Sequence, residues 1–525
     1  MKRVWPLLAI IGAALLVRAV LLAADVVPFD GDEAVVALMA RHILRGARPR
    51  FFYGQQYMGS LDAYLVAAAF ALFGEAALVM RWVQIGLFAG FLATSYGVTL
   101  RLRRDWDVAL LTVLLLALAP VALTLYTTVS LGGYGEALLI GNLLLWLGHR
   151  LGDEDARRYG RWLMWGLVAG LGFWILGLTM VYVVPIVVWW VWQNRLRPWR
   201  GYGLAGVGFV LGSAPWWWGR LDSATGSLVT QLVQGTTAAH TPLSNSAIRL
   251  FTFLTLGLPA VFGMRYPWSL GGPPLWLAFP VLIVYLAALG HALRRATSPP
   301  WRGERWVLWG IWLTLFLGFV FTPFGDDPTG RYFLPLYLPL AIFVADALRA
   351  LSKHVGRWMW AVAGALLCFN LFGVAQAAST YPPGLTANLF AAAQPDHHYD
   401  AALIDFLKTH NGTRGYSHYW VAYPIAFLSG ETVILAPQLP YKEDLSYNAK
   451  DDRYPQYSAL VANSPTVVYV NTAHAVLNAA LREQFVALGV TFQETKIGAY
   501  HVFYNLSRKV TPQELHFTGE AQPPF

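Results

Sequence analysis

The stretch WPLLAIIGAALLVRAVLLAADVVPFDGDE, residues 5–33, joins a long apolar run to three acids crowded into four positions. The apolar part is long enough to cross a bilayer, where a backbone can satisfy its hydrogen bonds only by forming a helix. Asp30, Asp32 and Glu33 follow this run almost at once. We therefore expect a first transmembrane helix whose outer end delivers these acids to a membrane surface.

The composition of the whole chain agrees with a membrane protein, because 56% of its 525 residues are hydrophobic and only 13% are charged. Further apolar runs recur to about residue 376, and short basic loops separate them. Lys2 and Arg3 place the N-terminus in the cytoplasm by the positive-inside rule. Alternation from that start gives about eleven transmembrane helices. Since the basic residues lie in these loops, the net charge of +9 indicates topology rather than nucleic-acid binding.

After residue 381 the sequence becomes mixed polar, charged and aromatic, with helical patterns between short strand-like runs. We expect a mainly α protein with two domains, a polytopic membrane domain over 1–376 and a small extracytoplasmic α/β domain over 381–525. Aromatic residues cluster at 416–423, where core packing is a better interpretation than a sugar platform. The single cysteine, Cys368, excludes a disulfide framework and a cysteine-based metal site.

The first outer loop, residues 25–75, carries most of the candidate site. EAVVALMARHILRG, residues 33–46, has helical spacing and predicts an amphipathic surface helix that ends near Gly46. Residues 61–74 predict either a second surface helix or a partial insertion. Between them lie polar groups able to bind hydroxyls, namely Tyr53, Gln55, Gln56, Tyr57 and Asp62.

The three acids have an ordinary interpretation beside the functional one. Asp32 and Glu33 suit the first turn of a helix, so a solvated helix start explains a bare acidic pair. Asp30 and Asp32 form an Asp-x-Asp, which hard cations bind through oxygen. A distant arginine, Arg331, lies at the outer end of a late helix. It suits either a snorkelling anchor or a partner for a lipid phosphate.

Several of these features together resemble the GT-C superfamily of membrane glycosyltransferases. The shared features are the Asp-Glu pair after the first span, the continuation MARHILRG, the later LFG and the outer-end RYFLPLYLP at residues 331–339. The resemblance is strongest to protein O-mannosyltransferases, lipid A aminoarabinose transferases and their bacterial relatives. It covers about residues 1–376.

The resemblance implies an inverting hexosyl- or pentosyltransferase that takes its sugar from a polyprenyl-phosphate carrier. Its catalytic aspartate falls on Asp32, with Glu33 as the second acid, and its phosphate position falls on Arg331. The remaining donor-binding candidates are Asp30, Tyr53, Gln55, Tyr57, Asp62 and Tyr332. Oligosaccharyltransferases of this superfamily use a metal and the closer relatives do not, so we expect no metal and no other cofactor. The acceptor is a lipid, a glycan or a protein.

Two departures leave the donor sugar open. The aminoarabinose transferases carry Arg-Tyr after their acidic pair and a lysine after the fifth helix, where this chain has Val35, Val36 and Met180. The main rival is a transporter or flippase of lipid-linked sugars, which should carry charges within its spans. Here charges concentrate in loops, with Arg18 and Arg81 as the chief exceptions. We expect a bacterial inner (plasma) membrane protein of the cell envelope.

Overall fold

The computed structural model describes residues 4–153, 158–194, 198–222, 242–298 and 303–515. It divides into two compact units. The helical unit comprises Met1–Ala24, Tyr57–Asp62 and Arg81–Ala377, and the mixed unit comprises Asp25–Gln56, Ala63–Met80 and Ala378–Phe525. The mixed unit thus contains most of the first loop besides the C-terminal region. The predicted domain limits, 1–376 and 381–525, stay a prediction.

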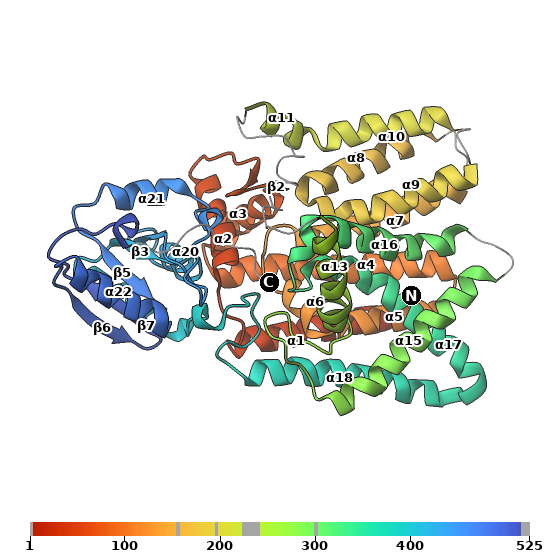
Figure 1. Ribbon diagram of the computed structural model, residues 1–525. Helices are drawn as coiled ribbons and strands as arrows, with labels where there is room; N and C mark the ends of the chain where they lie inside the picture. The colour runs from red at the N-terminus through yellow and green to blue at the C-terminus, as the bar shows by residue number, and fades with distance from the viewer. Residues whose placement is uncertain (1–3, 154–157, 195–197, 223–241, 299–302, 516–525) are drawn as a thin grey trace. The chain divides into compact units, whose positions relative to one another are not determined.

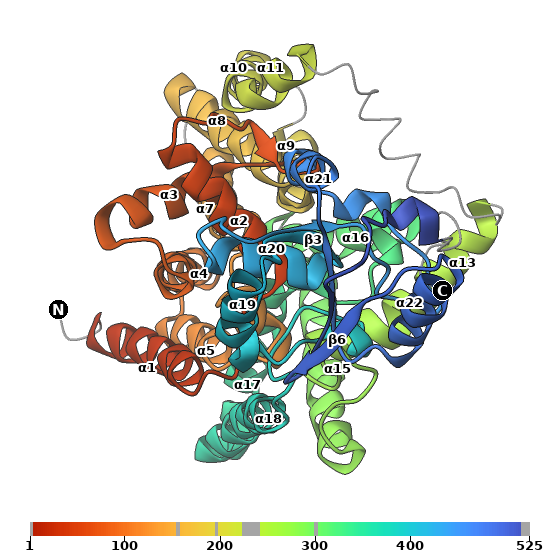
Figure 2. The same ribbon diagram turned by 90° about the vertical axis from the view of Figure 1, so that its left-hand side faces the viewer.

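The helical unit is a set of long helices that run side by side in Figure 1, and Figure 2 shows several of them closer to end-on. Packed pairs include α8 with α10, α9 with α16 and α5 with α17. Its helices are α1 (Val4–Ala23), α4 (Ala77–Arg103), α5 (Trp106–Ala117), α6 (Val121–Tyr126), α7 (Tyr134–Asp153), α8 (Tyr159–Ile175), α9 (Met180–Asn194), α10 (Trp199–Gly212), α11 (Ala214–Asp222), α13 (Pro242–Thr252), α14 (Leu258–Val261), α15 (Leu275–Thr297), α16 (Gly303–Phe321), α17 (Tyr337–Val355) and α18 (Met359–Ser379).

Six helical segments in the described part of the chain are long and apolar enough to cross a membrane. They are Val4–Ala23, Ala77–Arg103, Gly177–Asn194, Leu275–Thr297, Arg331–His354 and Gly356–Ser379. The chain is therefore an integral membrane protein that is mainly helical, as the sequence predicts. The count of about eleven spans stays a prediction.

One predicted helix is broken. The sequence predicts a single helix over 108–126, whereas α5 ends at Ala117 and α6 begins at Val121. Pro120 lies in the gap, and a proline disfavours helical geometry in the residue before it. The prediction of one continuous helix is wrong here because the apolar pattern continues through this proline.

The mixed unit contains a five-stranded sheet in the order β4-β3-β5-β7-β6. Strand β3 is parallel to β4 and β5, whereas β7 is antiparallel to both β5 and β6. Its elements are α2 (Gly31–Leu44), β1 (Phe51–Phe52), α19 (Asp400–Thr409), β3 (Arg414–Ser417), α20 (Tyr419–Leu428), β4 (Ile434–Pro437), α21 (Pro455–Ala462), β5 (Val468–Asn471), α22 (Ala475–Ala487), β6 (Gln493–Ile497) and β7 (Tyr500–Tyr504). Strand β2 (Gln55–Gly59) and helix α3 (Leu61–Phe73) each have residues in both units, because Tyr57–Asp62 belongs to the helical unit.

The core of the mixed unit lies between the sheet and helices α19 and α20. Leu403, Ile425, Leu435, Val470 and Val502 are buried there, one from each of five elements. Helix α20 begins two residues after β3 ends and packs against α2. The carboxyl end of a parallel strand, where open α/β sheets place their binding residues, thereby faces the helix that starts with the acidic cluster.

Candidate active site

The acidic cluster forms the start of α2. Asp30 is the N-cap residue, with extended backbone geometry, and its Oδ1 accepts a hydrogen bond from the Glu33 backbone N–H at 3.1 Å. Asp32 and Glu33 lie in the first turn, where the helix dipole favours negative charge. A helix is found where 33–46 was predicted, but it spans Gly31–Leu44 and is buried except at Asp32 and Leu44, so the prediction of an amphipathic surface helix is wrong. Local capping explains how three acids are accommodated within four positions.

Asp32 is the accessible member of the cluster. It is partly exposed, and its Oδ1 accepts a hydrogen bond from the Tyr419 hydroxyl at 2.5 Å. Tyr419 is the first residue of α20. A Cβ atom on Gly31 would lie 2.8 Å from Tyr419 Cε1 and 3.0 Å from its carbonyl oxygen. Only glycine therefore allows α2 to approach α20 this closely, and the approach brings the tyrosine to the aspartate.

Glu33 has a different environment, because it is completely buried while Asp32 is not. A substrate hydroxyl would reach Asp32 before it reached Glu33. The structure therefore separates the two predicted catalytic acids into one at the surface and one inside the mixed unit.

A second carboxyl lies near Asp32 and was missed by the sequence analysis. The pKa of Asp451 is raised to about 7, because burial and the charge of Asp32 raise it by more than Arg453 and the hydrogen bond with Tyr441 lower it. The Arg453 guanidinium lies 5.5 Å from the Tyr419 ring centroid. A carboxyl with a pKa near neutrality can take or give a proton under operating conditions. No motif marks Asp451, which lies 419 positions from Asp32 in the sequence.

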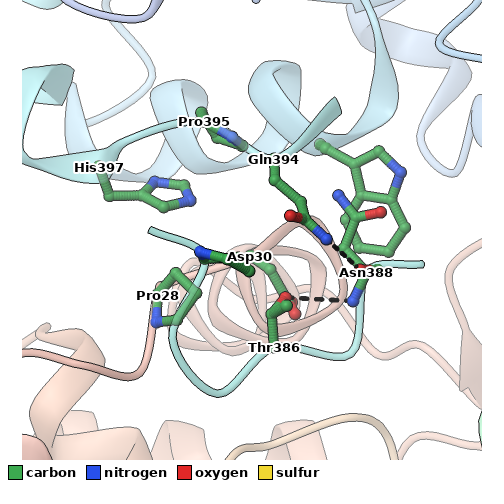
Figure 3. A pocket seen from close by; sticks show the side chains of 9 residues that line it. Pro28, Asp30, Thr386, Asn388, Gln394, Pro395 and His397 are labelled. Atoms are coloured by element: carbon green, nitrogen blue, oxygen red, sulfur yellow. Dashed lines mark hydrogen bonds between the residues drawn. The ribbon is translucent and has the colours of Figure 1, made fainter. Parts of the chain in front are cut away.

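Asp30 also lines a small polar hollow within the mixed unit (Figure 3). Thr386, Asn388, Gln394 and His397 supply the other polar side chains. Hydrogen bonds from Gln394 Nε2 to the Asn388 carbonyl at 2.7 Å, and from the Asn388 N–H to Thr386 Oγ1 at 3.1 Å, hold one side together. The enclosed volume is about 10 Å³, roughly what one water molecule occupies.

Of the predicted residues in the later loop, Tyr53 lies away from Asp32. Its hydroxyl is 3.1 Å from His42 Nδ1, and its ring stacks on Tyr454 with centroids 4.9 Å apart. His42 is ten residues beyond Asp32 on α2, which is about 15 Å along a helix. Gln55 begins β2 and is partly exposed. Tyr53 is thus part of an aromatic contact at the other end of α2.

Three predicted residues come together in the helical unit. Arg331 forms an ion pair with Asp327, and its guanidinium carbon lies 5.4 Å from the Tyr332 ring centroid. Phe324 joins this group to Tyr57, with centroids 5.2 Å from Tyr332 and 6.1 Å from Tyr57. The arrangement surrounds one cation with aromatic rings and a single carboxylate, which is suited to exchanging that carboxylate for another anion.

Two further arginines hold the loop that carries Arg331. Arg249 Nε and Nη2 donate to the two oxygens of Asp326 at 2.7 and 3.2 Å. Arg265 Nη1 donates to the Pro328 carbonyl at 2.6 Å. A bidentate pair fixes geometry as well as charge, so the position of this loop is well defined.

Asp62 is buried, and its carboxylate is hydrogen-bonded to other residues of the helical unit. It accepts hydrogen bonds from Gln84 Nε2 at 2.8 Å, Ser130 Oγ at 2.6 Å and the Gly132 N–H at 3.2 Å. The carboxyl group of Glu136, also buried, lies beside it. A proton shared between the two carboxyls would relieve their repulsion. Through its hydrogen bonds with Ser130 and Gly132, Asp62 orders the 130–133 loop.

Within the described ranges, no group of three or more His, Cys, Asp or Glu side chains is arranged to hold a metal ion.

Solved structures of two other proteins share this fold, and the resemblance expected from the sequence is confirmed at the level of the fold. ArnT from Cupriavidus metallidurans, solved with undecaprenyl phosphate, is 14% identical with a TM-score of 0.55, over 95% of this chain and 98% of its own. The apo structure of the same ArnT is 13% identical with a TM-score of 0.54, over 91% of this chain and 94% of its own. The apo oligosaccharyltransferase of Archaeoglobus fulgidus is 13% identical with a TM-score of 0.50, over 90% of this chain and 69% of its own. No family model and no curated protein sequence matched the chain.

Proposed function

We propose that the chain is a glycosyltransferase that moves a hexose or pentose from a polyprenyl-phosphate donor to an acceptor hydroxyl, with inversion at the anomeric carbon. The observation that carries the proposal is the partly exposed Asp32 carboxylate, held by Tyr419 at the start of α2. The similarity in fold to a transferase solved with undecaprenyl phosphate supports the class of donor.

The proposed reaction needs a base more than an acid. A sugar phosphate carries a stable leaving group, whereas an acceptor hydroxyl is a weak nucleophile. Asp32 would accept the hydroxyl proton as the acceptor oxygen bonds to the anomeric carbon. The carbon–oxygen bond to phosphate then breaks, and its electron pair leaves with polyprenyl phosphate. Attack opposite to the leaving group inverts the anomeric centre.

Arg331 is the residue that we propose for the phosphate, because a guanidinium pairs well with a phosphate and stabilises charge developing on it. Tyr57 and Tyr332, which share its aromatic surroundings, are proposed to line the donor site. Asp30, Gln55 and Tyr53 remain proposed donor contacts. For Glu33 and Asp62, both buried, we propose positioning roles.

The remaining parts of the proposal concern location and partners. We place the protein in a bacterial inner membrane with the N-terminus in the cytoplasm and residues 381–525 outside, from the distribution of basic loops. The acceptor is a lipid, a glycan or a protein, and the reaction needs no metal.

The test compares two conservative variants of the full chain in nanodiscs. Asp32→Asn should lower sugar transfer by about 10²- to 10⁴-fold, which is the usual contribution of a general base. Asp405→Asn, at an exposed position on α19, is the matched control and should be unaffected. The readouts are release of polyprenyl phosphate and the anomeric configuration of the product.

Three results would contradict the proposal. Near-normal transfer by Asp32→Asn would exclude this residue as the base. Retention of configuration would exclude direct displacement. Movement of intact lipid-linked sugar across the membrane, without release of polyprenyl phosphate, would favour the flippase.

A further inference from the structure

A second site lies in the helical unit, away from Arg331. It is a hollow of about 540 Å³ where α4, α15 and α17 end and α5 begins. Four cationic side chains line it, Arg103, Arg295, Arg349 and Lys353. Lys353 lies about 24 Å along α17 from that helix's first residue. The hollow therefore belongs to the end of α17 that is remote from the proposed phosphate residue.

The hollow has an excess of positive charge. Asp105 and Asp346 are the carboxylates in its lining, so four cations face two anions. Asp346 is buried and takes Arg103 Nε at 2.8 Å on one oxygen and Arg295 Nη1 at 3.2 Å on the other. Arg103 and Arg295 are thus fixed in position by one central acid, and the four cations still outnumber Asp105, Asp346 and the nearby Asp107.

Donor capacity remains after these ion pairs are counted. The Arg295 and Arg349 side chains are 44% and 42% exposed, and a guanidinium has five N–H donors. Arg349 directs Nε to Asp105 at 3.1 Å, Nη2 to Asp107 at 3.4 Å and Nη1 to Ser352 Oγ at 3.5 Å, so its donors are only partly engaged. Lys353 is exposed and forms no ion pair with a carboxylate in the described part of the chain. Several donors can therefore bind an incoming anion without breaking the network.

The surfaces beside the hollow are apolar. Trp106 on α5, Leu286 and Leu293 on α15, and Leu351 on α17 are all exposed large hydrophobic residues on the helices that form the hollow. In a membrane protein such surfaces face acyl chains. A ligand that fits both features has an anionic head and apolar tails.

We propose that this hollow binds the anionic headgroup of a membrane phospholipid, with the phosphate on Arg295, Arg349 and Lys353. The sequence predicts these basic segments on the inner face, where anionic lipids attract basic residues. Basic residues at helix C-termini also interact with the helix dipole, but that effect needs neither a hollow nor an excess of charge. This site is independent of the proposed transferase activity.

The experiment measures lipid binding by the full chain in nanodiscs of phosphatidylcholine with or without phosphatidylglycerol. Lipids retained by the protein are quantified by native mass spectrometry. Each removed charge should weaken retention of phosphatidylglycerol about fivefold, so the charge reversal Lys353→Glu should weaken it about 25-fold. Lys353→Gln, which removes one charge, should weaken retention of phosphatidylglycerol about fivefold. Lys408→Glu, an equal reversal at an exposed position of α19, should leave retention unchanged.

The outcomes separate the sources of phosphate. Preferential retention of phosphatidylglycerol that Lys353→Glu loses supports the proposal. Equal retention in Lys353→Glu and the unaltered chain overturns it. Thermal stabilisation by inorganic phosphate in pure phosphatidylcholine discs, without an effect of phosphatidylglycerol, also overturns it, because the ligand would then be a soluble anion.

Discussion

Glu431 holds the C-terminal end of the acidic helix α2. Its carboxylate accepts from His42 Nε2 at 3.1 Å, Arg45 Nη1 at 2.7 Å and the Tyr457 hydroxyl at 3.0 Å, and Arg41 Nη1 lies 3.5 Å away. Arg41, His42 and Arg45 are at the C-terminal end of α2 and beyond it. Replacing Glu431 with glutamine should therefore loosen α2, the helix whose other end carries the proposed base.

The stability lost on replacing Glu431 can be estimated from the pKa of its carboxylate. Burial acts to raise the pKa of Glu431, but the hydrogen bond and charge of His42, with Tyr457 and Arg45, lower it from the usual 4.5 to about 2. That difference corresponds to about 3 kcal/mol. The side chain is 15% exposed, so solvent screening reduces the contribution to about 1–2 kcal/mol.

The sign of the pH dependence is fixed by the direction of the shift. Because the folded-state pKa is lowered, the stabilisation is complete above about pH 4.5 and is lost as the pH falls toward 2. Glu431→Gln should thus cost about 1–2 kcal/mol at pH 7 and little at pH 2. As the pH falls from 7 to 2, the unaltered protein should lose the stabilisation by the Glu431 carboxylate, which Glu431→Gln lacks at every pH.

Urea unfolding of the full chain in nanodiscs, followed by pulse proteolysis of the mixed unit, measures this difference at a series of pH values. Glu483→Gln, an exposed position on α22, is the matched control and should follow the unaltered protein throughout. An equal loss of stability at pH 7 and pH 2 would refute the electrostatic reasoning, since a packing defect does not titrate.

Gly31→Ala should destabilise the mixed unit by about 1–3 kcal/mol and lower transfer, because the added methyl group overlaps Tyr419. Gly86→Ala, where a Cβ meets nothing within 4 Å, is its control, and equal effects of both in urea unfolding would contradict the explanation. Asp327→Asn should tighten binding of a polyprenyl phosphate about tenfold, since it removes the carboxylate that occupies Arg331. Weaker binding in a direct lipid-binding assay would instead show that Asp327 acts by holding Arg331 in place.

Much of the helical unit could be predicted from sequence, because a long apolar run that crosses a bilayer satisfies its backbone hydrogen bonds by forming a helix. The sequence predicts spans at about 5–24, 77–100 and 275–293, and long apolar helices are found at 4–23, 77–103 and 275–297. The broken segment at Pro120 shows the limit, since hydropathy does not sense the missing backbone donor of one proline. Helix α2 was predictable for a different reason, as its cap and first-turn acids act within four residues.

The partners of the candidate residues could not be predicted in the same way. Tyr419 belongs to an aromatic cluster for which core packing is the better interpretation, and the residue is indeed buried, with 3% of its surface exposed. Its hydroxyl nevertheless bonds Asp32, 387 positions away. A side chain can fill a core and still present a polar tip, and periodicity reports only the first property. Asp451 carries no local signal because its proximity to Asp32 arises only when the chain folds.

Helix geometry assigns the crowded acids different roles. Successive residues on a helix point about 100° apart, so Asp32 and Glu33 cannot face the same way. Glu33 is completely buried, whereas Asp32 is partly exposed beside Tyr419, and Asp30, just outside the helix, caps the backbone. An alanine at Asp30 would therefore disturb the helix start. Only Asp32 has an exposed carboxylate held by a neighbour, so within this cluster it alone combines access with a fixed position.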